Sequence, residues 1–83
     1  LSNDASGIKV DVFTTQSGLQ IYTGNWLSGC PEGKCGKSYE DYEGVAMECQ
    51  ALPDSPNKAN FPSAVLRPGE EYKEVIIFKF STL

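Results

Sequence analysis

Hydrophobic and polar residues alternate along three segments of the chain, at 8–15 (IKVDVFTT), 19–24 (LQIYTG) and 45–50 (VAMECQ). Successive side chains of a β-strand point to opposite faces, so this alternation predicts three strands, each with one face toward a core. In the third segment, Val45, Met47 and Cys49 share one face. Ala46, Glu48 and Gln50 share the other, which places a carboxylate beside a small side chain on an open surface.

The strongest predicted strand is Tyr72–Phe80 (YKEVIIFKF). Ile76, Phe78 and Phe80 share one face, and Val75 and Ile77 lie on the opposite one. Apolar residues on both faces predict burial between two layers. A chain this short cannot provide both layers, so we expect either another chain or the rest of a larger β-sandwich to cover this strand.

The remaining segments are rich in turn residues. Residues 25–43 form a long loop with four glycines, and loops of this length are often functional. The prolines of 53–62 exclude a central strand there. Ser63–Leu66 is predicted as a short strand, and Arg67–Glu70 as a type II turn with Pro68 and Gly69 at its central positions. No helix, repeat or linker is evident, so the chain is predicted to be all-β and residues 1–83 to form a single segment of one domain.

Two polar side chains stand out as candidate site residues, Glu48 and Gln20. Gln20 shares its strand face with Tyr22, and an amide next to an aromatic ring suits a sugar, which offers both hydroxyl groups and C–H faces. Both side chains could equally be ordinary surface groups, since most glutamates point to water.

The composition and charge of the chain argue against several classes of function. The chain of 83 residues has a net charge of −4 and no cluster of Lys or Arg, so neither nucleic acid nor an anionic membrane is expected as a partner. No apolar stretch approaches the ~20 residues that span a bilayer, and no signal peptide is visible. Gly36-Lys37-Ser38 is similar to the end of a phosphate-binding loop, but Pro31 stands where that motif needs glycine.

The chain has three cysteines and no histidine. Cys30 and Cys35 flank a glycine-rich turn and could pair if oxidised, but free thiols in a reducing compartment are favoured, which predicts a cytoplasmic location. Without histidine, the chain alone has no Ser-His or Cys-His pair. A zinc site would need all three thiolates and a carboxylate, and Cys49 is remote in sequence, so neither a metal nor another cofactor is expected.

Four stretches, TTQSGLQIYTGNWL, MECQALPDSPN, FPSAVLRPGEEY and FKFS, resemble in order the C-terminal part of the galactose mutarotase (aldose 1-epimerase) family. The resemblance runs from about Ile8 to Ser81. It implies that the chain is the last portion of a large antiparallel β-sandwich, a galactose mutarotase-like supersandwich, and that the rest of that fold is its partner. The sequence departs from the family at Cys49, where threonine is common, and in its cysteine-containing loop.

The resemblance also assigns roles. It implies that Glu48 is the catalytic base, that Gln20 contacts the sugar, and that the general acid is a histidine earlier in the fold. The implied activity of the complete protein is interconversion of the α and β anomers of galactose or glucose, whereas the isolated chain is expected to be inactive. The alternatives are a carbohydrate-binding or sugar-sensing protein without turnover, and a β-rich structural fragment with no ligand.

Overall fold

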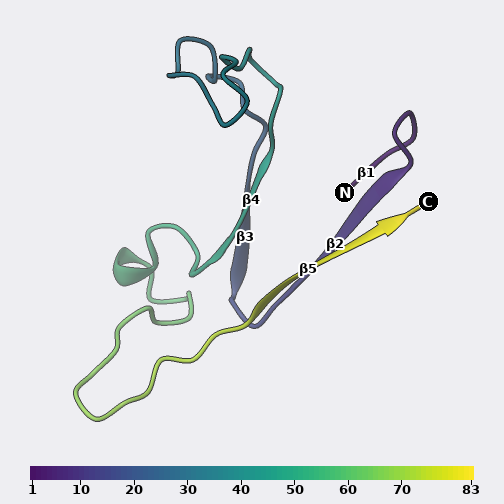
Figure 1. Cartoon of the computed structure of the whole chain (residues 1–83). Helices are drawn as coiled ribbons and strands as arrows, with labels where there is room; N and C mark the ends of the chain where they lie inside the picture. Colours follow the sequence, from purple (N-terminus) through teal and green to yellow (C-terminus); the bar gives the residue numbers. More distant parts are fainter. The chain divides into compact units, whose positions relative to one another are not determined.

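The computed structural model describes all 83 residues, and its regular elements are β-strands apart from one 3-10 turn. The strands are β1 (Ser2–Asn3), β2 (Ile8–Thr14), β3 (Gly18–Tyr22), β4 (Ala46–Gln50) and β5 (Ile76–Thr82), and the turn η1 covers Ser55–Asn57 (Figure 1). The all-β prediction is confirmed. No helix in the structure has the length and apolar character needed to cross a membrane.

The chain divides into two compact units. One comprises residues 1–18 and 49–83, and the other comprises residues 19–48.

The first unit contains an antiparallel sheet in the order β1-β2-β5. β2 and β5 pair along their whole length, from Ile8 opposite Thr82 to Thr14 opposite Ile76. The shorter pairing of β1 with β2 sets Asn3 opposite Ile8. A turn joins β1 to β2, and in it Gly7 has a φ of 66° and donates its N–H to the carbonyl of Asn3.

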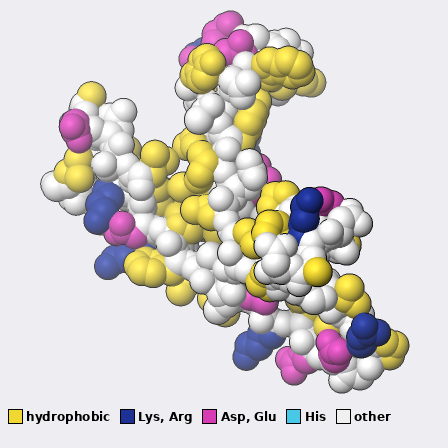
Figure 2. Space-filling view, turned by 180° about the vertical axis from the view of Figure 1, so that it is seen from behind, with side chains coloured by type: hydrophobic (Ala, Val, Ile, Leu, Met, Phe, Trp, Pro, Cys, Tyr) yellow, Lys and Arg dark blue, Asp and Glu magenta, His cyan; other side chains and the backbone are white.

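This sheet has little core of its own. Val10, at the centre of β2, is the buried hydrophobic residue, whereas all seven residues of β5 are exposed. Figure 2 shows hydrophobic side chains over much of the face in view. The predicted burial of the last strand is therefore not met within this chain, because one sheet supplies no second layer to cover either face of β5.

Two further expectations differ from the structure. Ser63–Leu66 is not a strand, and the last strand begins at Ile76 rather than Tyr72. The stretch before β5 is attached instead to the two residues that follow β2: Thr15 donates its N–H to the carbonyl of Val75, and the Gln16 amide donates to the Tyr72 hydroxyl. The type II turn is confirmed, since Glu70 N–H bonds to the carbonyl of Arg67 and Gly69 has a φ of 85°.

Candidate functional site: the hairpin of β3 and β4

β3 and β4 form a two-stranded sheet of their own, joined by the long loop at 23–45 (Figure 1). Each strand has five residues, and each pairs only with the other. Gln20 is the middle residue of β3, and Glu48 is the middle residue of β4. The two candidate site residues therefore lie on neighbouring strands.

Close approaches near both ends of the hairpin agree with an antiparallel pairing in which Gln20 lies opposite Glu48. At one end, a Cβ on Gly18 would lie 3.2 Å from the carbonyl oxygen of Gln50. Near the other end, a Cβ on Gly24 would lie 2.5 Å from the carbonyl oxygen of Gly44. Opposite residues of an antiparallel pair project from the same face with Cβ atoms about 4.5–5.5 Å apart. In that register the carboxylate and the amide share a face, and both residues are exposed in this chain.

The neighbours of this pair leave space above the sheet. In the same register Tyr22 lies opposite Ala46, one pleat along from Gln20 and Glu48. The Tyr22 side chain is half-buried, and its hydroxyl oxygen accepts the backbone N–H of Trp26 at 3.1 Å. The sequence places Tyr22 on the face of Gln20, but it gives no signal for this hydrogen bond, because the loop conformation alone brings the two groups together.

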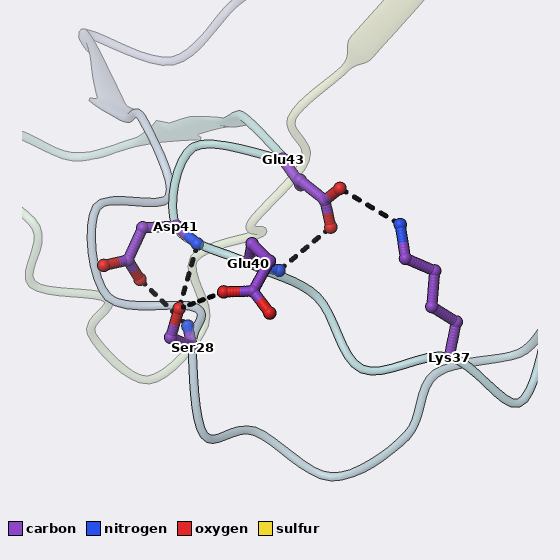
Figure 3. A network of polar contacts seen from close by, with 5 residues as sticks. All are labelled: Ser28, Lys37, Glu40, Asp41 and Glu43. Carbon is purple, nitrogen blue, oxygen red and sulfur yellow. Dashed lines mark hydrogen bonds and ion pairs between the residues drawn. The ribbon is translucent and has the colours of Figure 1, made fainter.

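Polar contacts clamp the loop where it leaves and re-enters the hairpin (Figure 3). The backbone N–H of Ser28 donates to the Asp41 carboxylate at 2.9 Å, and the N–H of Asp41 donates back to the Ser28 hydroxyl at 3.1 Å. The same hydroxyl donates to the Glu40 carboxylate at 3.1 Å. Tyr42 donates its N–H to the carbonyl of Gly24 at 2.8 Å. These bonds join two segments that are more than ten residues apart in sequence.

A second pair of contacts holds the other side of the loop. The Glu43 carboxylate accepts the backbone N–H of Glu40 at 2.9 Å and pairs with the Lys37 ammonium at 3.1 Å. These two interactions, the backbone bond first, hold the pKa of Glu43 below its ordinary value of 4.5. Glu43 therefore helps to hold the conformation of the loop.

Tyr42 carries an unusual backbone at this clamp. Its φ of 66° lies in the left-handed region, which residues with a Cβ seldom occupy. Its ring is 72% exposed, so burial of the ring does not compensate for the strain. The bond from Tyr42 N–H to the carbonyl of Gly24 holds the conformation instead, and no pattern in the sequence predicts it.

A compact turn follows β4 in the PDSPN segment. Asp54 has a φ of 62°, and its carboxylate accepts the Asn57 side-chain amide at 2.5 Å and lies 3.5 Å from the Lys58 ammonium. Ser55 is only 5% exposed, and both its hydroxyl and its N–H donate to the carbonyl of Leu52. The predicted loop is thus confirmed, with a 3-10 turn at its centre.

The cysteines are free thiols, with Cys30 and Cys35 exposed in the loop and Cys49 half-buried on β4. No group of three or more Cys, Asp or Glu side chains in the structure is placed to hold a metal ion.

The fold and the hairpin define a fragment of an antiparallel β-protein with an amide and a carboxylate at the centres of two paired strands. Residues 1–79 match the family model described as Aldose 1-epimerase, so the chain belongs to the aldose 1-epimerase family. The resemblance noted in the sequence is confirmed.

Curated relatives agree with this assignment. The chain is 52% identical to "Galactose mutarotase" of Mus musculus and 49% identical to that of Homo sapiens, in each case over 77 residues that cover 93% of the chain. It is 41% identical to "Aldose 1-epimerase" of Escherichia coli over 75 residues, or 88% of the chain. The chain spans 22% of the length of the two mammalian relatives and 21% of the bacterial one.

Proposed function

We propose that the complete protein is an aldose 1-epimerase that interconverts the α and β anomers of galactose or glucose, and that this chain supplies its general base. The single observation that carries the proposal is the pairing of β3 with β4, whose middle residues are Gln20 and Glu48, in a chain that belongs to this family. The remainder of the sandwich would supply the rest of the cleft and cover the exposed faces of β5.

In the proposed mechanism, the Glu48 carboxylate removes the proton from the hydroxyl on C1 while an acid protonates the ring oxygen. The bond from C1 to the ring oxygen breaks and leaves an open-chain aldehyde. Rotation about the C1–C2 bond presents the other face of the carbonyl, and the reverse proton transfers close the ring as the opposite anomer. The family resemblance implies a histidine as the acid, and this chain has none, so we infer that the acid comes from the rest of the protein.

Gln20 would orient the sugar over the base. Its amide offers two N–H donors and a carbonyl acceptor, which can hold adjacent hydroxyl groups of one hexose. A fixed position matters because a proton transfer requires heavy atoms about 2.6–3.2 Å apart. The opposing positions on the two strands provide a rigid support for both groups.

The test uses polarimetry of freshly dissolved α-galactose with the complete protein and its Glu48→Gln variant. The amide keeps the shape of the side chain but cannot act as a base, so turnover should fall by about 10²–10⁴-fold while sugar binding is largely retained. Glu71→Gln, which changes an exposed carboxylate outside the strands, is the matched control and should keep normal turnover.

Normal turnover in Glu48→Gln would exclude Glu48 as the base. If the unmodified complete protein binds galactose but does not accelerate mutarotation, the protein is a sugar-binding protein and not an enzyme. Gln20→Ala should weaken binding, by roughly 1–3 kcal/mol if it removes a buried hydrogen bond to the sugar.

The proposed location of the complete protein is the cytoplasm. Three free cysteines in a chain of this size favour a reducing compartment. Subcellular fractionation that recovers the protein with secreted proteins would contradict this.

A further inference from the structure

Tyr22 is the side chain next to the proposed base and amide that the mechanism does not use. We propose that its ring forms an apolar wall of the sugar site, on which a C–H face of the hexose lies. The inference rests on the proposed function, because it concerns how the same hairpin holds the same sugar.

The position of Tyr22 in the sheet brings the ring to the site. It lies two residues beyond Gln20 on β3, and side chains two residues apart share a face. Two residues of a strand advance the chain by about 6.6 Å, which is close to the width of a pyranose ring. A hexose held between Gln20 and Glu48 therefore reaches the ring of Tyr22 without leaving the sheet.

The residue across from Tyr22 leaves that space open. In the register described above, Tyr22 lies opposite Ala46, whose side chain is a single methyl group. A larger side chain at this position would occupy the surface over which the sugar must lie. The tyrosine ring is itself only half-buried, so part of it remains available to a ligand.

The ring is also held in place. Its hydroxyl oxygen accepts the N–H of Trp26 at 3.1 Å, and that segment is fixed to residues 40–42 by the clamp of Figure 3. A ring fixed at both its Cβ and its hydroxyl loses little further freedom when a ligand binds. Because the hydroxyl oxygen already accepts the Trp26 N–H and holds the ring in place, we assign the contribution of Tyr22 to sugar binding to the ring.

The chemistry suits a sugar rather than another polar ligand. One face of a pyranose carries several C–H groups, and an aromatic ring contacts such a face while neighbouring amide and carboxylate groups bind the hydroxyls. Gln20, Glu48 and Tyr22 together supply all three kinds of contact. This arrangement predicts that Tyr22 contributes to binding and orientation and takes no part in proton transfer.

The experiment compares Tyr22→Met and Tyr22→Phe in the complete protein, with α-D-galactose and polarimetry. Methionine has a similar volume but no ring, so KM should rise by roughly 2–12-fold, the range that an aromatic contact of this kind supplies, with kcat changed by less than about twofold. Phenylalanine keeps the ring, so its KM should stay within about twofold of the original.

Tyr72→Met is the matched control. Tyr72 is 66% exposed, and its hydroxyl likewise accepts one hydrogen bond, from the Gln16 amide at 2.6 Å, but it lies outside the hairpin. Its KM should be unchanged. The inference is overturned if Tyr22→Met leaves KM unchanged, if both Met variants raise KM alike, or if Tyr22→Phe raises KM as much as Tyr22→Met does.

A second measurement does not depend on the methionine variant folding. In protein deuterated everywhere except at tyrosine, saturation of the tyrosine ring protons should transfer to bound galactose, and Tyr22→Phe should reduce that transfer. A transfer that persists undiminished in Tyr22→Phe would overturn the inference. If Glu48→Gln loses turnover while Tyr22→Met has no effect, the role of Tyr22 is refuted and the proposed function is not.

Discussion

Gly24 is the position where one added methyl group should most disturb the hairpin. It is buried beside the loop clamp, with a φ of 72°. A Cβ there would lie 2.5 Å from the carbonyl oxygen of Gly44 and 2.9 Å from a methyl carbon of Leu27. The leucine can rotate away, but the carbonyl belongs to the chain that leads into β4 and cannot move without displacing that strand.

The expected cost of Gly24→Ala has two parts. An L-residue in the left-handed region costs roughly 1–2 kcal/mol. Displacing the backbone oxygen of Gly44 adds a similar amount, so we expect the free energy of unfolding of the complete protein to fall by roughly 2–4 kcal/mol. Because the shift propagates toward Ala46 and Glu48, kcat/KM should also fall.

Urea unfolding of the complete protein measures this, and Gly36→Ala is the matched control. Gly36 lies in the same loop with a φ of 66°, and a Cβ there would meet no atom within 4 Å. The control therefore contains the backbone strain without the collision and should cost only roughly 1–2 kcal/mol. Equal losses of stability in the two variants would refute the close approach of Gly24 to Gly44.

Three further outcomes are expected. A carbon NMR titration should give Glu43 a pKa below 4.5, and that pKa should rise in Lys37→Ala. Because the pKa is lower in the folded state, Glu43 stabilises the folded loop at pH values above its unfolded pKa. This stabilisation is lost as the pH falls through the folded pKa. Thiol titration of the native protein should find Cys30 and Cys35 reactive, and a result of no free thiol at either would contradict the structure. The 83-residue chain alone should not accelerate mutarotation of α-galactose in polarimetry, and rapid equilibration would show that its acid lies within these residues.

The strands that the sequence predicted well are those in which alternation and local turns agree. The pattern placed β2 and β4 to within one or two residues, because each has a clear polar face and a turn on at least one side. It also placed Gln20 and Glu48 on strands, and each proves to be the middle residue of its strand. The register itself could not be derived, since it depends on how the loop at 25–43 closes.

The misses have a common origin in strand pairing, which the pattern within a single segment does not reveal. β1 has only two residues and no pattern of its own, and it is a strand because β2 lies alongside it. Ser63–Leu66 has a strand-like composition but no strand to pair with, so it stays irregular. The hydrophobic faces of β5 predict burial, but all seven residues are exposed because this chain does not contain a layer to cover them.

The pairing of β2 with β5 joins two segments that are synthesised at well-separated times. During synthesis at about 5–20 residues per second, β2 waits several seconds before the residues of β5 exist to pair with it. Closing the intervening segment of about sixty residues also costs roughly 3–4 kcal/mol of chain entropy, which the pairing itself must offset. Until then, the edge of β2 that β5 will occupy is a row of unpaired backbone groups. The hairpin that carries Glu48 closes over a much shorter loop and can form first. The proposed catalytic strands β3 and β4 can therefore pair before β5 is made and completes the other sheet.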